Sequence, residues 1–139
     1  MSSLQKIKPG YLLPSAAYTL KRRQIVRCLP VGDDAPKLGD ALYVEVERLG
    51  HHVEVINKRG RVHRLVRGSR LIGVIGSRYA PDEFEMMAPT EWTTHLNLAS
   101  RGGVLAELSE KNSAAATPTR VRVLGHVADE EGTPLNTLD

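Results

Sequence analysis

Hydrophobic and polar residues alternate most regularly between residues 41 and 48. In an extended chain Val44 and Val46 fall on one face there, and Glu45 and Glu47 fall on the other. A period of two residues is that of a strand with one buried and one solvated face. The pattern therefore predicts a half-buried antiparallel strand over residues 41–48.

The next part of the chain has the pattern of a hairpin followed by a buried strand. Residues 53–56 alternate, residues 57–60 supply a turn that ends in glycine, and residues 61–66 supply the returning strand. Residues 71–75 form a continuous apolar run, which is typical of a strand buried on both faces. Gly73 within this run favours a bulge or a bend.

Short strands account for most of the remaining sequence. They are predicted at residues 24–29, 94–98, 104–111 and 120–127, with a helix as the alternative for residues 104–111. Residues 76–85 are expected to form a loop with an acidic end.

Short strands with short connections predict a mainly β fold. We expect a small antiparallel β-barrel or meander that forms a single domain over residues 23–139. Residues 1–22 have no clear period and contain Pro9, Gly10 and Pro14, so they are expected to be an irregular segment that lies along the domain.

Composition narrows the class of protein. The chain has 139 residues, of which 41% are hydrophobic and 25% charged, and this fits one globular domain. The apolar runs are far shorter than the roughly 20 residues that a membrane helix needs, and residues 1–13 lack the apolar core of a secretory signal. Cys28 is the single cysteine, so no intrachain disulfide can form and a reducing compartment, the cytoplasm, is expected.

Positive charge is concentrated in residues 58–70. This run holds six of the chain's cationic residues, Lys58, Arg59, Arg61, Arg64, Arg67 and Arg70. Such a density is suited to neutralising the phosphates of a nucleic acid, although the run contains no aromatic residue on which a base could stack. A solvated hairpin face explains the charges as well, and so does cover by the acidic residues 82–85 and 129–131.

No catalytic or metal-binding pattern is present. His51 and His52 are neighbours, whose side chains point to opposite faces of a strand, and the other three histidines lie on separate segments. Cys28 on a predicted strand is typical of a small core residue. Glu45 and Glu47 share a face as a catalytic pair would, but a solvent-facing stripe accounts for them. We predict no catalytic residue, no metal site and no cofactor.

Two glycine loops have the composition of an anion-binding backbone. Residues 76–78 and residues 100–103 each combine flexible backbone N–H donors with an arginine. Neither loop has the Gly-x-x-x-x-Gly-Lys-Ser/Thr spacing of a P-loop, and no Gly-x-Gly-x-x-Gly follows a predicted strand. Hydrolysis of a nucleotide by these residues is therefore not expected.

Four motifs in a fixed order carry a resemblance to a known family. They are Gly39-Asp40 at the start of a strand, the central Gly-x-Arg segment, residues 76–85, and residues 132–136. Together they resemble the amino-terminal β-rich module of a bacterial family of uncharacterised P-loop ATPase-like proteins, over residues 23–139. The resemblance implies that a P-loop ATPase domain follows such a module. Because this chain ends at Asp139, we expect a stand-alone relative or an excised domain.

These observations favour a non-enzymatic β-barrel that acts as a binding or regulatory module and recognises a protein partner or an anionic ligand. Its expected contact residues are Arg78, Tyr79, Asp82, Arg101, Gly102 and Gly103. One alternative is a nucleic-acid-binding barrel that uses the basic hairpin. Another is a small enzyme with an organic substrate in the barrel lumen. The expected partners are a protein, a P-loop ATPase domain, a nucleic acid or a second copy of the chain, and a membrane is not expected.

Overall fold

The computed structural model describes residues 5–32, 34–79, 85–108 and 117–138, and these residues are mainly β. Two short 3₁₀ helices, η1 (Ser15–Ala17) and η2 (Arg22–Gln24), lie near the N-terminus. The strands are β1 (Gln5–Lys6), β2 (Arg27–Leu29), β3 (Ala41–Arg48), β4 (Glu54–Ile56), β5 (Val62–Arg64), β6 (Arg70–Ile75), β7 (Arg78–Tyr79), β8 (Glu85–Met87), β9 (His95–Leu98), β10 (Val104–Leu108) and β11 (Arg120–Ala128). No helix in these described ranges is long and apolar enough to cross a membrane.

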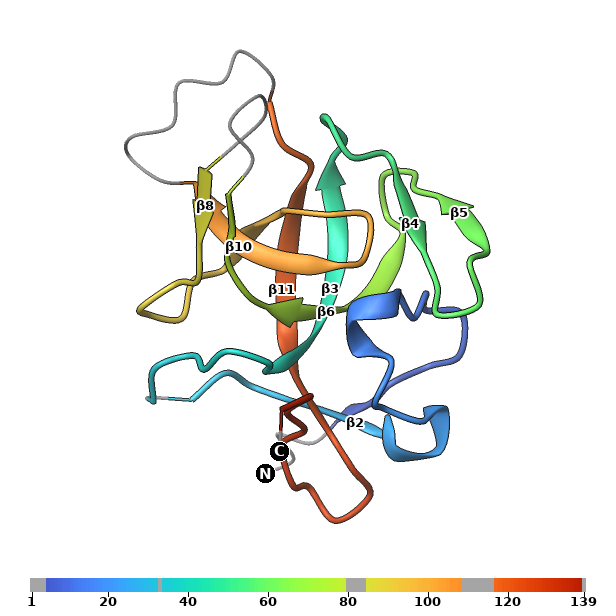
Figure 1. The fold of residues 1–139 in the computed structure, drawn as a ribbon. Helices are drawn as coiled ribbons and strands as arrows, with labels where there is room; N and C mark the ends of the chain where they lie inside the picture. The colour runs from blue at the N-terminus through green and yellow to red at the C-terminus, as the bar shows by residue number, and fades with distance from the viewer. Residues whose placement is uncertain (1–4, 33, 80–84, 109–116, 139) are drawn as a thin grey trace.

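Five of the strands close into a barrel, which confirms the predicted fold class. Around the ring β3 pairs with β6, β6 with β10, β10 with β9, β9 with β11, and β11 with β3 (Figure 1). All pairs are antiparallel except β6 with β10, where Val104 lies opposite Val74. A meander would pair strands in chain order, whereas the ring is closed here by the C-terminal strand β11.

The barrel interior is filled with side chains. Every strand of the ring contributes to this core, which comprises Leu42, Val44, Val46, Val55, Leu65, Leu71, Ile75, Leu96, Leu98, Leu105 and Val121. Gly73 faces inward where Leu105 lies, and a Cβ at position 73 would meet the Leu105 side chain. The absence of a side chain at Gly73 therefore makes room for Leu105. A filled interior argues against the alternative of an enzyme with its substrate in the lumen.

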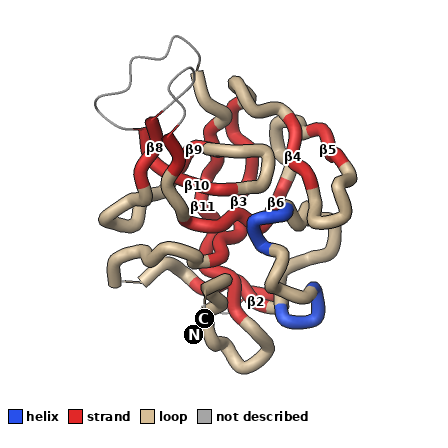
Figure 2. Tube along the Cα trace, viewed as in Figure 1, coloured by secondary structure: helices blue, strands red, loops and turns tan. Residues whose placement is uncertain are grey.

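The N-terminal segment covers the outer face of β3 and β6. Ala17, Leu20 and Ile25 pack there in a second core together with Tyr43 and Ile72, whose side chains point out of the barrel. The backbone of Leu12 joins β6 through N–H···O bonds of 2.8 Å to Arg70 and 3.0 Å from Ile72. The segment predicted to be irregular, residues 1–22, thus contains the 3₁₀ turn η1 and reaches the start of η2, both coloured blue in Figure 2, and it lies along the barrel.

Two segments differ from the sequence-based expectation. Residues 76–85 were expected to form a loop, but residues 78–79 form β7, which pairs with β8 and extends the sheet beyond β10. The Ser77 hydroxyl accepts a hydrogen bond of 2.8 Å from the Ala88 N–H and so ties the two ends of this hairpin together. The strand predicted at residues 24–29 begins only at Arg27, because residues 22–24 form η2.

Candidate anion-binding site

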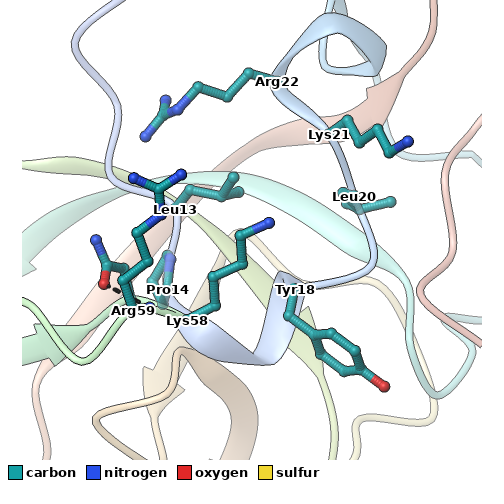
Figure 3. Close-up of a pocket in the computed structure, with 9 residues that line it drawn as sticks. Leu13, Pro14, Tyr18, Leu20, Lys21, Arg22, Lys58 and Arg59 are labelled. Atoms are coloured by element: carbon teal, nitrogen blue, oxygen red, sulfur yellow. Dashed lines mark hydrogen bonds between the residues drawn. The ribbon is translucent and has the colours of Figure 1, made fainter.

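A pocket of about 400 Å³ lies between the N-terminal segment and the turn of the β4–β5 hairpin (Figure 3). Its lining comes from two parts of the chain that are far apart in sequence: Leu13, Pro14, Tyr18, Leu20, Lys21 and Arg22 on one side, and Asn57, Lys58 and Arg59 on the other. Figure 1 shows the blue segment beside the green hairpin. We call this cavity the basic pocket.

The hairpin turn presents its cations through a fixed backbone. The Asn57 side-chain oxygen accepts hydrogen bonds of 3.0 Å from the N–H groups of Arg59 and Arg61. Gly60 has a φ of +84°, which glycine adopts without steric cost. The side chains of Lys58 and Arg59 consequently project from a rigid turn and are exposed.

The loop of residues 100–103 holds the two walls of the basic pocket together. The carbonyl of Gly102 accepts a hydrogen bond of 2.8 Å from the N–H of Ala16, in η1. The carbonyl of Arg101 accepts one of 2.8 Å from the N–H of Ile56, at the end of β4. In addition, the Arg101 guanidinium lies 3.3 Å from the carboxylate of Glu54. This loop, which we predicted to bind an anion itself, serves as the support behind the pocket.

Four cationic side chains line the basic pocket, and no acidic residue is among its described lining residues. Within the described part of the chain, Lys21, Lys58 and Arg59 have no ion pair, and Arg22 lies over the ring of Tyr11 at 5.0 Å from its centroid. Figure 3 shows the guanidinium groups of Arg22 and Arg59 on the Leu13 side and Lys58 extending between the two walls, while Lys21 points away from these three. Positive charge around one cavity attracts an anion.

The N-terminal wall of the pocket was missed by sequence reasoning. Lys21 and Arg22 belong to a short basic run, but nothing in the sequence places this run next to residues 58–59. Tyr18 is 65% exposed at the edge of the pocket, with its ring pointing outward (Figure 3). The fold therefore supplies the aromatic residue that the basic run itself lacks.

The predicted basic hairpin is only partly available for binding. Arg61, Arg64 and Arg67 are exposed. Arg70 instead donates hydrogen bonds to the Tyr43 hydroxyl at 3.1 Å and to the Glu45 carboxylate at 3.4 Å, because β6 lies beside β3. In the described ranges, no side chain of residues 129–131 covers the hairpin cations, and residues 82–84 lie outside those ranges.

The carboxylates of β3 are paired with cations on the neighbouring strands. Glu45 lies 2.9 Å from Arg122 of β11 as well as 3.4 Å from Arg70. Glu47 is hydrogen-bonded to the His95 ring at 2.8 Å and lies 3.6 Å from Arg120. The predicted solvent-facing stripe is thus an ion-pair network on the outside of the barrel.

Because of this ion-pair network, we expect the free energy of unfolding to fall as the pH becomes acidic. The hydrogen bond from Arg122, and then that from Arg70, hold the pKa of Glu45 below its ordinary value, while partial burial opposes them. A lowered pKa in the folded state adds stability above the unfolded-state pKa, about 4.3, and this stability is lost as pH falls through the lower, folded-state pKa. We expect the urea midpoint of Glu45→Gln to fall less on acidification than that of the wild type, with Glu131→Gln as the control. Equal acid dependence in Glu45→Gln and wild type would contradict this assignment.

The structure separates the other residues that we predicted for partner binding. Arg78 and Tyr79 form β7, which pairs with β8, and β8 in turn pairs with Glu107 and Leu108 at the C-terminal end of β10. Arg101, Gly102 and Gly103 precede the opposite end of β10 and face η1, where Gly103 lies against Pro14. Asp82 lies outside the described residues. β7 and residues 101–103 therefore lie at opposite ends of β10.

A second cavity, of about 430 Å³, contains Asp40, Trp92 and His126. Three of its polar side chains, those of Asp40, His126 and Asn136, are engaged in structural bonds. The Asp40 carboxylate accepts hydrogen bonds from the N–H of Lys37 at 2.8 Å and from the amide of Asn136 at 2.9 Å, and His126 Nε2 is bonded to the Leu135 carbonyl at 3.1 Å. The motif residues 39–40 and 132–136 therefore meet here and join the C-terminal segment to the start of β3.

The remaining candidate residues take structural places. No group of three or more histidine, cysteine, aspartate or glutamate side chains in the described ranges could hold a metal ion. Cys28 is buried in the second core, and burial raises the pKa of its thiol, against an opposing effect of Arg70. A buried thiol with a raised pKa is a poor nucleophile.

No family model, no curated protein and no solved structure matches this chain. The resemblance to the module of P-loop ATPase-like proteins therefore stays a prediction.

Proposed function

We propose that this protein is a non-enzymatic binding module that recognises an anionic, phosphate-bearing ligand in the basic pocket. The observation that carries the proposal is that four cationic residues, 21–22 and 58–59, line one cavity that has no carboxylate among its described lining residues. Arginine and lysine are the side chains that bind phosphate most strongly, through charge-assisted hydrogen bonds.

The shape of the pocket supports a bound anion over mere solvation of the charges. Leu13, Pro14 and Leu20 form an apolar part of the lining, so water is partly excluded beside the cations. Electrostatic attraction is stronger where water is excluded. Both walls are also fixed by backbone hydrogen bonds to residues 101–102, so little order has to be gained when a ligand binds.

The proposal is tested by titrating the protein with inorganic pyrophosphate in a calorimeter, at low ionic strength and again at about 0.15 M. We expect binding that weakens with salt and that Arg59→Gln weakens by about tenfold, because a charged hydrogen bond contributes about 1.5–3 kcal/mol. Lys37→Gln removes one positive charge from the second cavity and serves as the matched control. Absence of pyrophosphate binding at low salt, or equal effects of the two substitutions, would refute the proposal.

Three further assignments belong to the same proposal. The cytoplasm is the proposed location, since Cys28 is the single cysteine of the chain. Membership of the P-loop ATPase-like family, with an ATPase domain as partner, rests on the order of the four motifs. A protein partner or a second copy could add to the edge of the sheet at β7 or β1, which are its two terminal strands.

A further inference from the structure

We infer that the phosphate-bearing ligand is a single-stranded nucleic acid, with its backbone on the cations of the basic pocket and one base stacked on Tyr18. This inference rests on the proposed function, because it assigns a ligand class to the same pocket. Four observations carry it: the position of Tyr18, the exposed cations of the hairpin beyond the pocket, the exposed apolar residues among them, and the concave shape of the site.

Tyr18 offers an aromatic face that no packing contact of the fold requires. Its side chain is 65% exposed, and its backbone N–H is bonded to Ser15 at 3.0 Å, so that η1 fixes the position of the residue. Exposed large aromatic side chains next to cations are the usual means of binding unpaired bases, which stack on the ring. A ligand made only of phosphate would gain nothing from Tyr18.

More exposed cations follow the pocket residues along the hairpin. After Lys58 and Arg59 come Arg61, Arg64 and Arg67, all exposed and, in the described ranges, without an ion pair. The last of them, Arg67, lines a neighbouring hollow together with Glu45 and Glu47. A small anion would need only the pocket, whereas a chain of phosphates could also contact cations beyond it.

Two exposed apolar residues of the hairpin lie among these cations in the sequence. Val62 follows Arg61, Val66 precedes Arg67, and their side chains are 44% and 58% exposed. Apolar side chains among cations suit the bases and sugars of an unpaired strand better than the regular phosphate surface of a duplex. The pocket is also concave and only about 400 Å³, so a flexible single strand can enter it more readily than a rigid double helix.

The inference is tested by fluorescence anisotropy with a labelled oligothymidylate of about 12 nucleotides, a length within the range of known single-strand sites. The purified full chain is titrated into this probe and, separately, into a labelled duplex of equal length. Thymidine monophosphate and inorganic pyrophosphate are then added as competitors of the bound single strand. The variants are Tyr18→Ala, Tyr18→Phe and Arg64→Gln, with Lys37→Gln as the control for charge. Because Tyr18 and Arg64 are exposed, thermal melts of the variants are expected to match that of the wild type.

We expect the single strand to bind more tightly than the duplex and than either competitor. Tyr18→Ala should weaken oligothymidylate binding by about tenfold and leave pyrophosphate binding unchanged, while Tyr18→Phe retains affinity. Arg64→Gln should reduce the slope of log affinity against log salt by about 0.7, the value for one phosphate contact with a single strand.

Each other result has a distinct meaning. Three results would overturn the inference and leave the proposed function standing. The first is pyrophosphate binding without tighter oligothymidylate binding, and the second is equal binding of the duplex. The third is an effect of Tyr18→Ala on the binding of both ligands or of neither. Thymidine monophosphate binding as tightly as the oligonucleotide would assign the pocket to a free nucleotide and would also overturn it. Failure of every anion to bind would overturn the inference and the proposed function together.

Discussion

Reversal of both charges in the hairpin turn, Lys58→Glu with Arg59→Glu, is expected to lower the affinity for pyrophosphate at least a hundredfold. Each substitution removes a charged hydrogen bond of about 1.5–3 kcal/mol and replaces it with a repelling carboxylate. A hundredfold loss corresponds to about 2.7 kcal/mol. Calorimetry at low ionic strength measures the effect directly.

The fold should tolerate this double substitution. Lys58 and Arg59 are exposed, and the turn is held by the Asn57 side chain and by Gly60, neither of which changes. We expect unfolding free energies within about 0.5 kcal/mol of the wild type. A variant with Lys37→Glu and Arg48→Glu makes the same change in net charge away from the pocket lining. If this control lost as much affinity, only the net charge of the protein would matter and the pocket assignment would be wrong.

The second large effect is expected from Gly125→Ala in the closing strand. Gly125 lies where the register of β11 against β3 shifts, and a Cβ there would meet the Leu29 carbonyl and the Cys28 sulfur. The Leu29 backbone cannot move aside without breaking the pairing between β2 and β11. We expect a loss of about 3 kcal/mol or more, since overpacking against backbone is at the upper end of such costs. A drop in melting temperature of about 10 °C would report it.

Gly32→Ala is the matched control for this prediction. A Cβ at position 32 would lie 3.6 Å from its nearest neighbour, the Asp34 carboxylate, which is an ordinary contact. The unfolding free energy should therefore change by less than about 0.5 kcal/mol. Equal stability of Gly125→Ala and Gly32→Ala would show that β11 is not packed against β2 in the described way.

The longer strands of the barrel could be predicted from sequence because they carry a local signal. Residues 41–48 alternate between apolar and charged side chains, and residues 71–75 form an apolar run, so both were located within a residue. The ring order could not be predicted in the same way. Nothing local states that β11 lies between β2 and β3 or that β10 runs parallel to β6. Such pairings depend on how all strands bury their apolar faces at once.

At the candidate site, too, some residues could be predicted from local sequence, whereas their neighbours in space could not. Lys58 and Arg59 stand out as part of a basic run, but the run does not separate them from Arg70, which is held by Glu45 and Tyr43. No local sequence pattern marks Tyr18 as a site residue, because only the fold places it beside the hairpin turn some forty residues later in the chain. The N-terminal segment reaches the hairpin because its apolar residues cover the outside of β3 and β6.

The composition of the glycine loop at residues 100–103 fits an anion site, but it also fits the packing role that the loop has in the structure. An anion-binding loop needs flexible backbone and an arginine. A loop that packs closely against another segment and forms an ion pair needs the same residue types. Gly103 has a φ of +91°, and a Cβ there would lie 2.7 Å from Pro14. Arg101 is paired with Glu54. The close approach of the N-terminal segment accounts for these glycines, and the loop holds the two walls of the basic pocket together.

The central claim, that the basic pocket binds anions, is tested most directly by a titration of isotopically labelled protein with inorganic pyrophosphate, followed through backbone amide chemical shifts. If the basic pocket binds pyrophosphate, we expect the largest chemical-shift changes on residues 13, 15–22 and 57–61, which form or support the pocket walls. Shifts concentrated on residues 76–79, or on residues 34–40 and 126–136 around the second cavity, would contradict it, as would no shift at low ionic strength.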